Sequence, residues 1–448
     1  MTLFRARVLD TPEDPFVGDP RDPSHLRAGE DVGIVVVDGT ITERDDFGVV
    51  RAAHPHEAVI DLRDGWLLPG LVDTHVHYPQ VRVIGALGMP LLEWLERCAL
   101  PEEQRLADPA YAAEVATEFV GSLVAAGTTT ALVFGSHFPA AVDALFTEAA
   151  HYGLRITSGL VVSDRGLPEP LLVDPRRAAA DQAMLAARWH GVGRTRYAVT
   201  PRFSYSASDA MLDACAEAAA SVPGAWFTSH VNENPAEVAE VGRLFRNAEH
   251  YVDTYDRHGL LGPRSVLAHN VHASDAELAV LAAAGSAVAH CPSSNSALGS
   301  GLFPMRRHLV HGVTVALGSD VGAGTGFSMF KEGLQACFVQ GLLGAEGVAL
   351  SAAQLLWLAT RGGARALGLD DQVGDLSVGR QFDAICVRPR GGTALDIGLR
   401  HVGSPAEALG KIFALAGDPD VADVWVGGEQ VAAAGLRRPA HVGGRPAR

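Results

Sequence analysis

Two histidines spaced two residues apart, His75 and His77, follow the apolar run at residues 66–72 and have the types and spacing of metal ligands. The pair alone is a weak signal, because a chain with 18 histidines is expected to contain about one such pair by chance. A second pair, His54 and His56, flanks a proline in a polar stretch and fits a surface loop. The first pair differs because it ends an apolar strand, where alternation puts both side chains on one face.

Three later apolar runs also deliver an ionisable side chain at their C-terminal end, namely His230, His269 and Asp320. Each of these residues, taken singly, fits an isolated polar group at a strand end. Zinc prefers neutral imidazole and carboxylate ligands, and a catalytic zinc keeps one position for water. Because several such groups end neighbouring strands, we predict a zinc site held by His75, His77, His230 and Asp320.

The scaffold for this site must bring the ends of several strands together. Between residues 66 and 320, apolar runs of strand length alternate with alanine-rich helical segments, which is typical of β/α units around a parallel sheet. About eight units are present, enough to close a (β/α)8 barrel whose functional groups gather at the C-terminal ends of its strands. The runs lie at residues 66–77, 129–135, 154–162, 196–203, 225–231, 265–271, 287–292 and 313–320.

Both ends of the chain have a different texture, with short strands separated by glycine turns. One example is the β-branched run at residues 32–42, which is broken by the hairpin signal Asp38-Gly39. We therefore predict that residues 1–66 and 377–448 pair into one small β-domain. The metal-dependent barrel domain, residues 67–376, is inserted between them.

Composition excludes several classes of protein. The net charge of −16 argues against binding to nucleic acid or an anionic membrane. No apolar run approaches the ~20 residues of a membrane helix, and the first residues lack the apolar core of a signal peptide. The five scattered cysteines fit free thiols in a reducing compartment. We expect a cytoplasmic protein that acts on a small molecule.

The motifs around these residues resemble the amidohydrolase superfamily and, within it, the guanine deaminases. The resemblance is carried by PGLVDTHVHYPQ, PLLEWLERCALPEE, GTTTALVFG, RYAVTPRFSYS, TSHVNENPAEV, DTYDRHGLLGPRSVLAHNVH, AHCPSSNSALGSGLFP and LGSDVGAGTGFS, which cover most of residues 65–370. It implies an α/β fold with a distorted (β/α)8 TIM-type barrel and a small β-sandwich domain built from both termini. It also implies zinc-dependent hydrolysis of guanine to xanthine and ammonia in purine catabolism, and we expect a homodimer.

The positions of the lysines bear on the number of metal ions. Superfamily members with two metals bridge them with a carboxylated lysine on a middle strand. No lysine lies between His77 and Lys331. One zinc ion per chain is therefore expected.

The resemblance also implies catalytic roles for three residues. Glu233 would be the general acid/base that moves the protons, although by itself it fits a solvated carboxylate at the start of a helix. Asp320 would bind zinc and accept a proton from the attacking water. His269 would either bind the metal directly or sit beside the water and stabilise charge on the intermediate.

Four further residues would bind the substrate. At an apolar barrel mouth the guanidinium of Arg202 needs an acceptor, and guanine offers O6 and N7. Phe203 would stack on the purine or belong to the core, and Gln80 would read another ring edge or be an exposed amide. Trp94 lies in the segment 91–103, which would close over the site.

Two other functions stay open from the sequence. The same scaffold would also serve a related aminohydrolase or chlorohydrolase that acts on 8-oxoguanine, a pterin or a triazine. A protein of another class, a catalytically inactive scaffold with this fold, should have lost a ligand or the proton shuttle. Neither is missing from this chain, which favours an enzyme.

Overall fold

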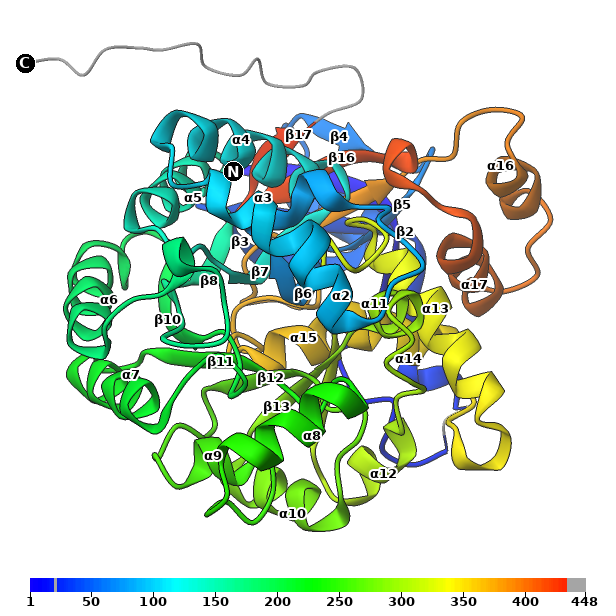
Figure 1. Cartoon of the computed structure of the whole chain (residues 1–448). Coiled ribbons are helices and arrows are strands. Elements are labelled where there is room, and N and C mark those ends of the chain that lie inside the picture. The colour runs from blue at the N-terminus through cyan, green and yellow to red at the C-terminus, as the bar shows by residue number, and fades with distance from the viewer. Residues whose placement is uncertain (20–21, 433–448) are drawn as a thin grey trace, which may run out of the picture.

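The computed structural model describes residues 1–19 and 22–432, in which a barrel packs against a sheet made from both ends of the chain (Figure 1). The parts of the predicted β-domain that fall on residues 433–448 lie outside the described residues. None of the described helices is long and apolar enough to cross a membrane.

Eight parallel strands form the barrel, and each is hydrogen-bonded to the next one along the chain. Their side chains are almost all buried on both faces, as expected for parallel strands covered by helices. The predicted TIM-type barrel is therefore confirmed. The strands are β6 (Leu71–His77), β7 (Thr128–Phe134), β8 (Arg155–Ser158), β10 (Arg196–Pro201), β11 (Trp226–Val231), β12 (Ser265–His269), β13 (Ala287–His290) and β14 (Thr314–Leu317), with the short β9 (Val161–Val162) pairing with β10.

The helices around the barrel begin at clear sequence signals. Asp108, Asp174 and Ser208 each cap a helix through a side-chain oxygen that accepts a backbone N–H, and proline follows the first two caps. The main helices are α4 (Pro109–Ala125), α5 (Pro139–Tyr152), α6 (Pro175–Trp189), α7 (Asp209–Ser221), α8 (Pro235–Leu244), α9 (Asp253–Asp256), α10 (Asp275–Ala284), α11 (Pro292–Ala297), α12 (Met305–Val310), α13 (Met329–Leu342), α14 (Ala352–Ala359) and α15 (Arg361–Ala366).

The first and last barrel strands, β6 and β14, are the two ends of the strand order, and Asp73 fastens them together. Its carboxylate accepts hydrogen bonds from the Ser319 backbone N–H (3.0 Å) and hydroxyl (2.5 Å). The backbone N–H of Asp320 in turn donates to the carbonyl oxygen of His75 at 2.8 Å. We call these hydrogen bonds the Asp73 seam. They place two of the predicted metal ligands, His75 and Asp320, side by side.

The terminal segments form one mixed sheet of eight strands. It folds over on itself, because Phe4 contacts Phe382 (ring centroids 4.5 Å apart) and Trp425 (5.7 Å), although two strands separate β1 from β16 in the sheet. The predicted sandwich is thus a single folded sheet around one apolar core. Its strands are β1 (Thr2–Asp10), β2 (Arg27–Val37), β3 (Thr40–Asp46), β4 (Val59–Asp61), β5 (Trp66–Pro69), β15 (Ala384–Val387), β16 (Val421–Val426) and β17 (Glu429–Ala432), and α1 (Phe47–Ala53) packs on β2 and β3. Helix α17 (Pro405–Leu415) packs instead on the barrel helices α13 and α14, with α16 (Ala394–Leu399) beside it.

A helical segment covers the barrel mouth where the sequence predicts a closing element. It follows the 3-10 turn η2 (Tyr78–Val83) and consists of α2 (Leu91–Trp94), the π-helical turn η3 (Leu95–Ala99) and α3 (Leu100–Arg105). Its apolar side chains pack against Phe203 and Leu298 from the barrel loops. We call residues 91–105 the cover segment.

A buried ion pair joins the barrel to the terminal sheet. Arg155, at the start of β8, donates to the carboxylate of Asp383 at 2.8 Å, and the two side chains are 4% and 1% exposed. Asp383 also accepts the backbone N–H of Gly427 at 2.7 Å. The pair is therefore desolvated and shared between the two parts of the fold.

We predict that Arg155→Met lowers the free energy of unfolding by about 3–5 kcal/mol, because it leaves the Asp383 carboxylate buried without its cation. Thermal and urea unfolding of the purified variant measure this. The control is Arg63→Met, which removes an exposed pair with Asp61 and should cost less than about 1 kcal/mol. Equal effects of the two substitutions would contradict the importance of the buried pair.

Candidate functional site

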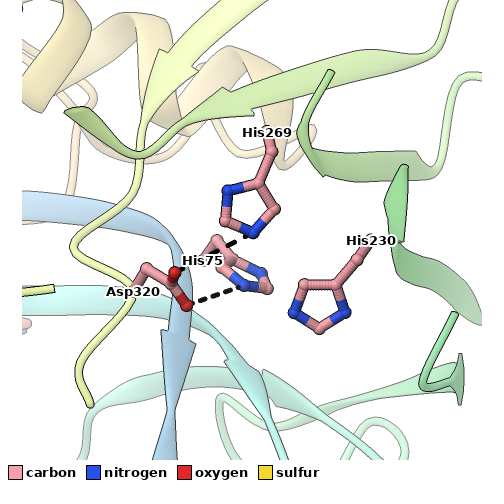
Figure 2. A group of neighbouring side chains, drawn as sticks. All are labelled: His75, His230, His269 and Asp320. Carbon is pink, nitrogen blue, oxygen red and sulfur yellow. Dashed lines mark ion pairs between the residues drawn. The ribbon is translucent and has the colours of Figure 1, made fainter. Parts of the chain in front are cut away.

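Strand ends from across the barrel bring five ionisable side chains to one point. His75 and His77 come from β6, His230 from β11 and His269 from β12, and Asp320 follows β14. All five are buried. Figure 2 shows the rings of His75, His230 and His269 gathered around the Asp320 carboxylate. The structure thus brings the predicted metal ligands together.

Backbone strain helps to aim these groups. His269 and Asp320 have positive φ angles of 72° and 50°, and Asn232 and Asn270 have φ angles of 49° and 50°. A residue other than glycine in this region costs of order 1–3 kcal/mol, and such residues cluster at functional sites. Here the strain turns the chain sharply at the strand ends, where the side chains must face inward.

The donor atoms have the spacing of a single metal site. Nε2 of His77 lies 3.1 Å from Nε2 of His230 and 3.2 Å from Oδ1 of Asp320, and Nε2 of His75 lies 3.2 Å from the same oxygen. Two donors that each bind one zinc ion at about 2.0–2.1 Å in a tetrahedron are about 3.3 Å apart. Nε2 of His75 is also buried without a well-formed hydrogen bond among the described residues. These residues therefore fit a bound zinc ion.

The protonation states also suit a metal. Burial lowers the pKa of His75, brings that of His77 to about 4 and places that of His230 well below its ordinary value. Burial opposes ionisation of Asp320, but the imidazoles of His75 and His77, each 3.2 Å from its Oδ1, hold the pKa of its carboxyl well below the usual range. Neutral imidazoles and an anionic carboxylate are the forms that bind metal ions.

His269 lies next to this group at slightly longer range. Its Nε2 is 3.8 Å from Oδ2 of Asp320 and 3.5 Å from Oε2 of Glu233, and its Nδ1 is 2.9 Å from the side-chain oxygen of Asn295. The position serves either of the two predicted roles, binding the metal or stabilising charge beside it.

Glu233 sits at the edge of the same group. Ser300 donates to its Oε1 at 3.4 Å, and burial together with the charge of Asp320 raises the pKa of its carboxyl well above the ordinary value. The loop that carries it is held by Glu237, which accepts the backbone N–H groups of Glu233 (3.0 Å) and Asn234 (3.2 Å). A buried carboxyl with a raised pKa beside a metal site is suited to general acid/base chemistry.

A pocket opens onto these groups, and His77, His230, Glu233 and Asp320 form part of its lining. The four residues predicted to bind the substrate all line it. Phe203 is buried, stacks on Tyr205 and contacts His230 edge-on, so it belongs to both the pocket wall and the core. Trp94 is 2% exposed, and Gln80 is 1% exposed, so the exposed-amide alternative for Gln80 is wrong.

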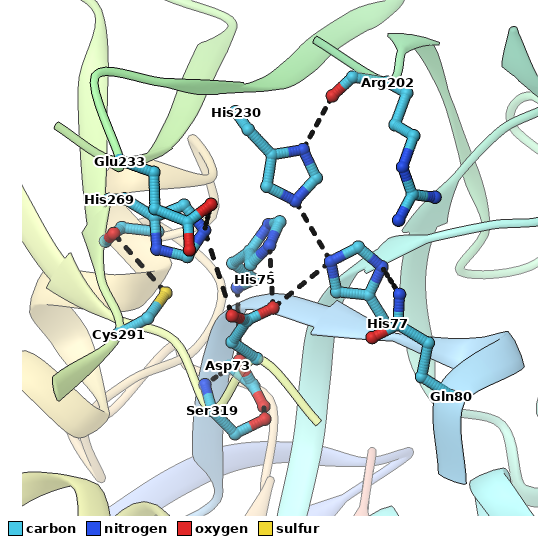
Figure 3. A network of polar contacts seen from close by, with 12 residues as sticks. Asp73, His75, His77, Gln80, Arg202, His230, Glu233, His269, Cys291 and Ser319 are labelled. Carbon is cyan, nitrogen blue, oxygen red and sulfur yellow. Dashed lines mark hydrogen bonds and ion pairs between the residues drawn. The ribbon is translucent and has the colours of Figure 1, made fainter. Parts of the chain in front are cut away.

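Arg202 has a partner that the sequence analysis did not foresee. Nη1 of its guanidinium donates to both carboxylate oxygens of Glu103 at 2.8 and 2.7 Å, so part of its hydrogen-bonding need is met within the protein. The backbone carbonyl of Arg202 also faces Nδ1 of His230 at 2.6 Å, as Figure 3 shows. Arg202 therefore contacts the metal group and the pocket at once.

Sequence reasoning missed several supporting residues. Glu103 lies in the cover segment, where a glutamate in a helix usually indicates a solvated face. Ser300, Asn295 and Glu237 lie in the motifs that carry the resemblance, but their contacts with Glu233 or His269 depend on how the loops meet in space. His54, in contrast, lies beside the terminal sheet 3.0 Å from Glu43 and is not part of the site.

Known proteins resemble this chain over nearly its whole length. The model of the amidohydrolase family matches residues 66–431. A probable guanine deaminase of Deinococcus radiodurans is 57% identical over 433 residues, 96% of this chain and 98% of that protein. The solved structure of guanine deaminase from Escherichia coli has a TM-score of 0.93 at 34% identity and covers 97% of this chain and 100% of its own. An adenosine deaminase of Xanthomonas campestris with bound zinc has a TM-score of 0.81 at 25% identity, covering 99% and 94%.

We predict that His75→Ala and His77→Ala lose most of the bound metal, because removing one ligand from a set of four leaves an incomplete coordination shell. Elemental analysis of the purified variants measures this. The matched controls are His54→Ala and His56→Ala, which should keep the parental metal content. Full metal content in His75→Ala would show that the site lies elsewhere.

Proposed function

This chain belongs to the amidohydrolase family, and we propose that it is a zinc-dependent guanine deaminase that hydrolyses guanine to xanthine and ammonia. One observation carries the proposal. The neutral imidazoles of His77 and His230 and the anionic carboxylate of Asp320 line a pocket beside the carboxyl of Glu233 with its raised pKa, and His75 lies 3.2 Å from the same carboxylate. The similarity to relatives named as guanine deaminases supports the choice of substrate.

The proposed reaction divides the chemistry between the metal and the side chains. Zinc held by His75, His77, His230 and Asp320 would lower the pKa of a bound water to about 7 and so supply the nucleophile at neutral pH. Glu233 passes protons to the ring nitrogen and then to the departing amine. Asp320 can accept a proton from the water, and His269 lies close enough to both carboxylates to stabilise developing charge.

The opposite side of the pocket orients the purine. One guanidinium nitrogen of Arg202, Nη1, donates hydrogen bonds to Glu103. The other guanidinium donors can bind the O6 and N7 acceptors of guanine. Gln80 forms a hydrogen bond with another edge of the purine ring. Phe203 and the cover segment, including Trp94, enclose the flat faces of the purine ring and exclude water from it.

The cellular setting is part of the proposal. The five cysteines are all free, which fits a reducing cytoplasm, and the reaction would serve purine catabolism. A related substrate such as 8-oxoguanine, a pterin or a triazine would need the same metal and proton shuttle. A panel of these compounds with guanine, assayed by ammonia release at one enzyme concentration, distinguishes them.

We predict that Glu233→Gln keeps the fold and the metal but loses turnover by about 10²–10⁴-fold or more, because an amide of the same volume cannot shuttle protons. Ammonia release and elemental analysis on one preparation measure both properties. Binding of hypoxanthine, which has no 2-amino group to release, tests whether the pocket is intact. Turnover close to the parental rate would assign Glu233 a structural role only.

We predict turnover of guanine and none of adenine. The 6-amino group of adenine would set donor against donor at Arg202, and adenine has no 2-amino leaving group. A site built to hydrogen-bond one group can reject an analogue without it by roughly 10⁴–10⁵-fold. Ammonia release from the two purines at equal concentration measures the preference.

The companion variant is Arg202→Met, which should lose most of kcat/KM for guanine while it keeps its metal. A preference for adenine, or an Arg202→Met variant as active as the parent, would refute guanine as the substrate. Neither result would argue against the assignment of the metal site.

A further inference from the structure

We propose that Glu103 is a positioning residue that sets the substrate specificity of the pocket by orienting Arg202 and Gln80. The inference rests on the proposed function, because it concerns how that substrate is held. Glu103 lies in α3 of the cover segment, outside the metal group, and lines no part of the pocket wall itself.

The carboxylate of Glu103 is bonded to both residues at once. It accepts two hydrogen bonds from Nη1 of Arg202, at 2.8 and 2.7 Å, and one from Nε2 of Gln80 at 2.8 Å. The side chains of Arg202 and Glu103 are 4% and 3% exposed. Buried, charge-assisted hydrogen bonds of this kind are strong and directional, so they fix the orientation of both partners.

The contact with Gln80 determines which end of its amide is free. A carboxylate only accepts, so the NH₂ end of the amide must face Glu103, and Oε1 is left as an acceptor. Oε1 has no hydrogen-bond partner among the described residues. The backbone opposite it is glycine, and a Cβ at Gly322 would lie 2.3 Å from Oε1. Glu103 and Gly322 therefore hold one amide pose from two sides.

The contact with Arg202 has a similar effect. Nη1 faces the Glu103 carboxylate, so the Nε and Nη2 donors keep a fixed direction. The negative charge of Glu103 also balances the guanidinium. The pocket can then offer donors to a neutral heterocycle without favouring an anion. A donor edge from Arg202 and an acceptor from Gln80 together match the acceptor and N–H groups along the edge of a 6-oxopurine.

A purely structural role for Glu103, tying the cover segment to the barrel, is the rival explanation. It predicts a less stable protein whose folded fraction binds substrate normally. A positioning role predicts weaker binding of substrate by a protein that is folded and loaded with metal. Separate measurement of KM and kcat distinguishes the two, because a smaller folded fraction lowers the apparent kcat at an unchanged KM, whereas a positioning role raises KM.

The test is Glu103→Gln, assayed with guanine in the metal-loaded enzyme. We expect KM to rise about tenfold or more with kcat within about threefold of the parent, because the lost interaction orients the substrate and takes no part in proton transfer. The matched control is Glu102→Gln. Glu102 is the neighbouring buried carboxylate of α3, and it bonds to Tyr111 and Arg105 instead. This control should leave KM and kcat unchanged.

A double-mutant cycle gives a second, independent readout. If Glu103 acts through Arg202 and Gln80, then Glu103→Gln should raise KM less in the Arg202→Met background than in the parent, because only the part that acts through Gln80 remains. The double variant removes both charges of the buried pair, so it is expected to fold even if Glu103→Gln alone does not, and an unchanged KM relative to Arg202→Met would then contradict the contribution through Gln80. Additive effects in the cycle, or an unchanged KM in folded Glu103→Gln, would overturn the proposal.

The parent enzyme separates this inference from the proposed function. An absence of guanine turnover by the parent would refute the proposed function. The same measurements on the substrate that the parent does use would then decide the role of Glu103. Guanine turnover with an unchanged KM in Glu103→Gln would refute the role of Glu103 alone.

Discussion

A carboxylate buried among histidine rings is the constraint on which the rest of the structure depends. Asp320 keeps its negative charge although burial opposes it, because His75 and His77 lie 3.2 Å from the same oxygen. Charge of this kind is costly in a protein interior unless it is paired or bound to a metal ion. The strained strand ends and the Asp73 seam keep these groups in place, and the barrel supplies the strands that carry them.

The pKa values of two carboxyl groups at the same site are shifted in opposite directions. The neighbouring imidazoles of His75 and His77 hold the pKa of Asp320 low, whereas burial and the nearby charge of Asp320 raise the pKa of Glu233. Pairs of titratable groups whose surroundings push their pKa values apart are a general means of assigning acid and base roles. Glu237, which holds the backbone of the Glu233 loop, is itself buried with a pKa of about 7, so the whole loop is built around carboxyls protected from water.

The barrel and the metal group could be predicted from the sequence because both follow from local patterns. Apolar runs identify the strands, and parallel strands bring their C-terminal ends together, so the positions of His75, His230 and Asp320 in those runs were enough. Glu103 could not be found in this way. Its contact with Arg202 joins residues 99 apart in the chain, and a glutamate in a helix looks like a solvated side chain. The folding of the terminal sheet onto itself likewise depends on the meeting of Phe4 and Trp425, which no local pattern encodes.

The terminal sheet has a consequence for how the protein is made. Trp66 of β5 pairs with Val387 of β15, so a strand near the start of the chain receives its neighbour only after the entire barrel has been synthesised. Contacts between such distant segments form slowly, and unpaired strand edges are prone to aggregation while they wait. During translation the nascent chain therefore carries an open β5 edge until β15 emerges from the ribosome. A chain truncated before β15 would keep every metal ligand and still expose this edge to chaperones and proteases.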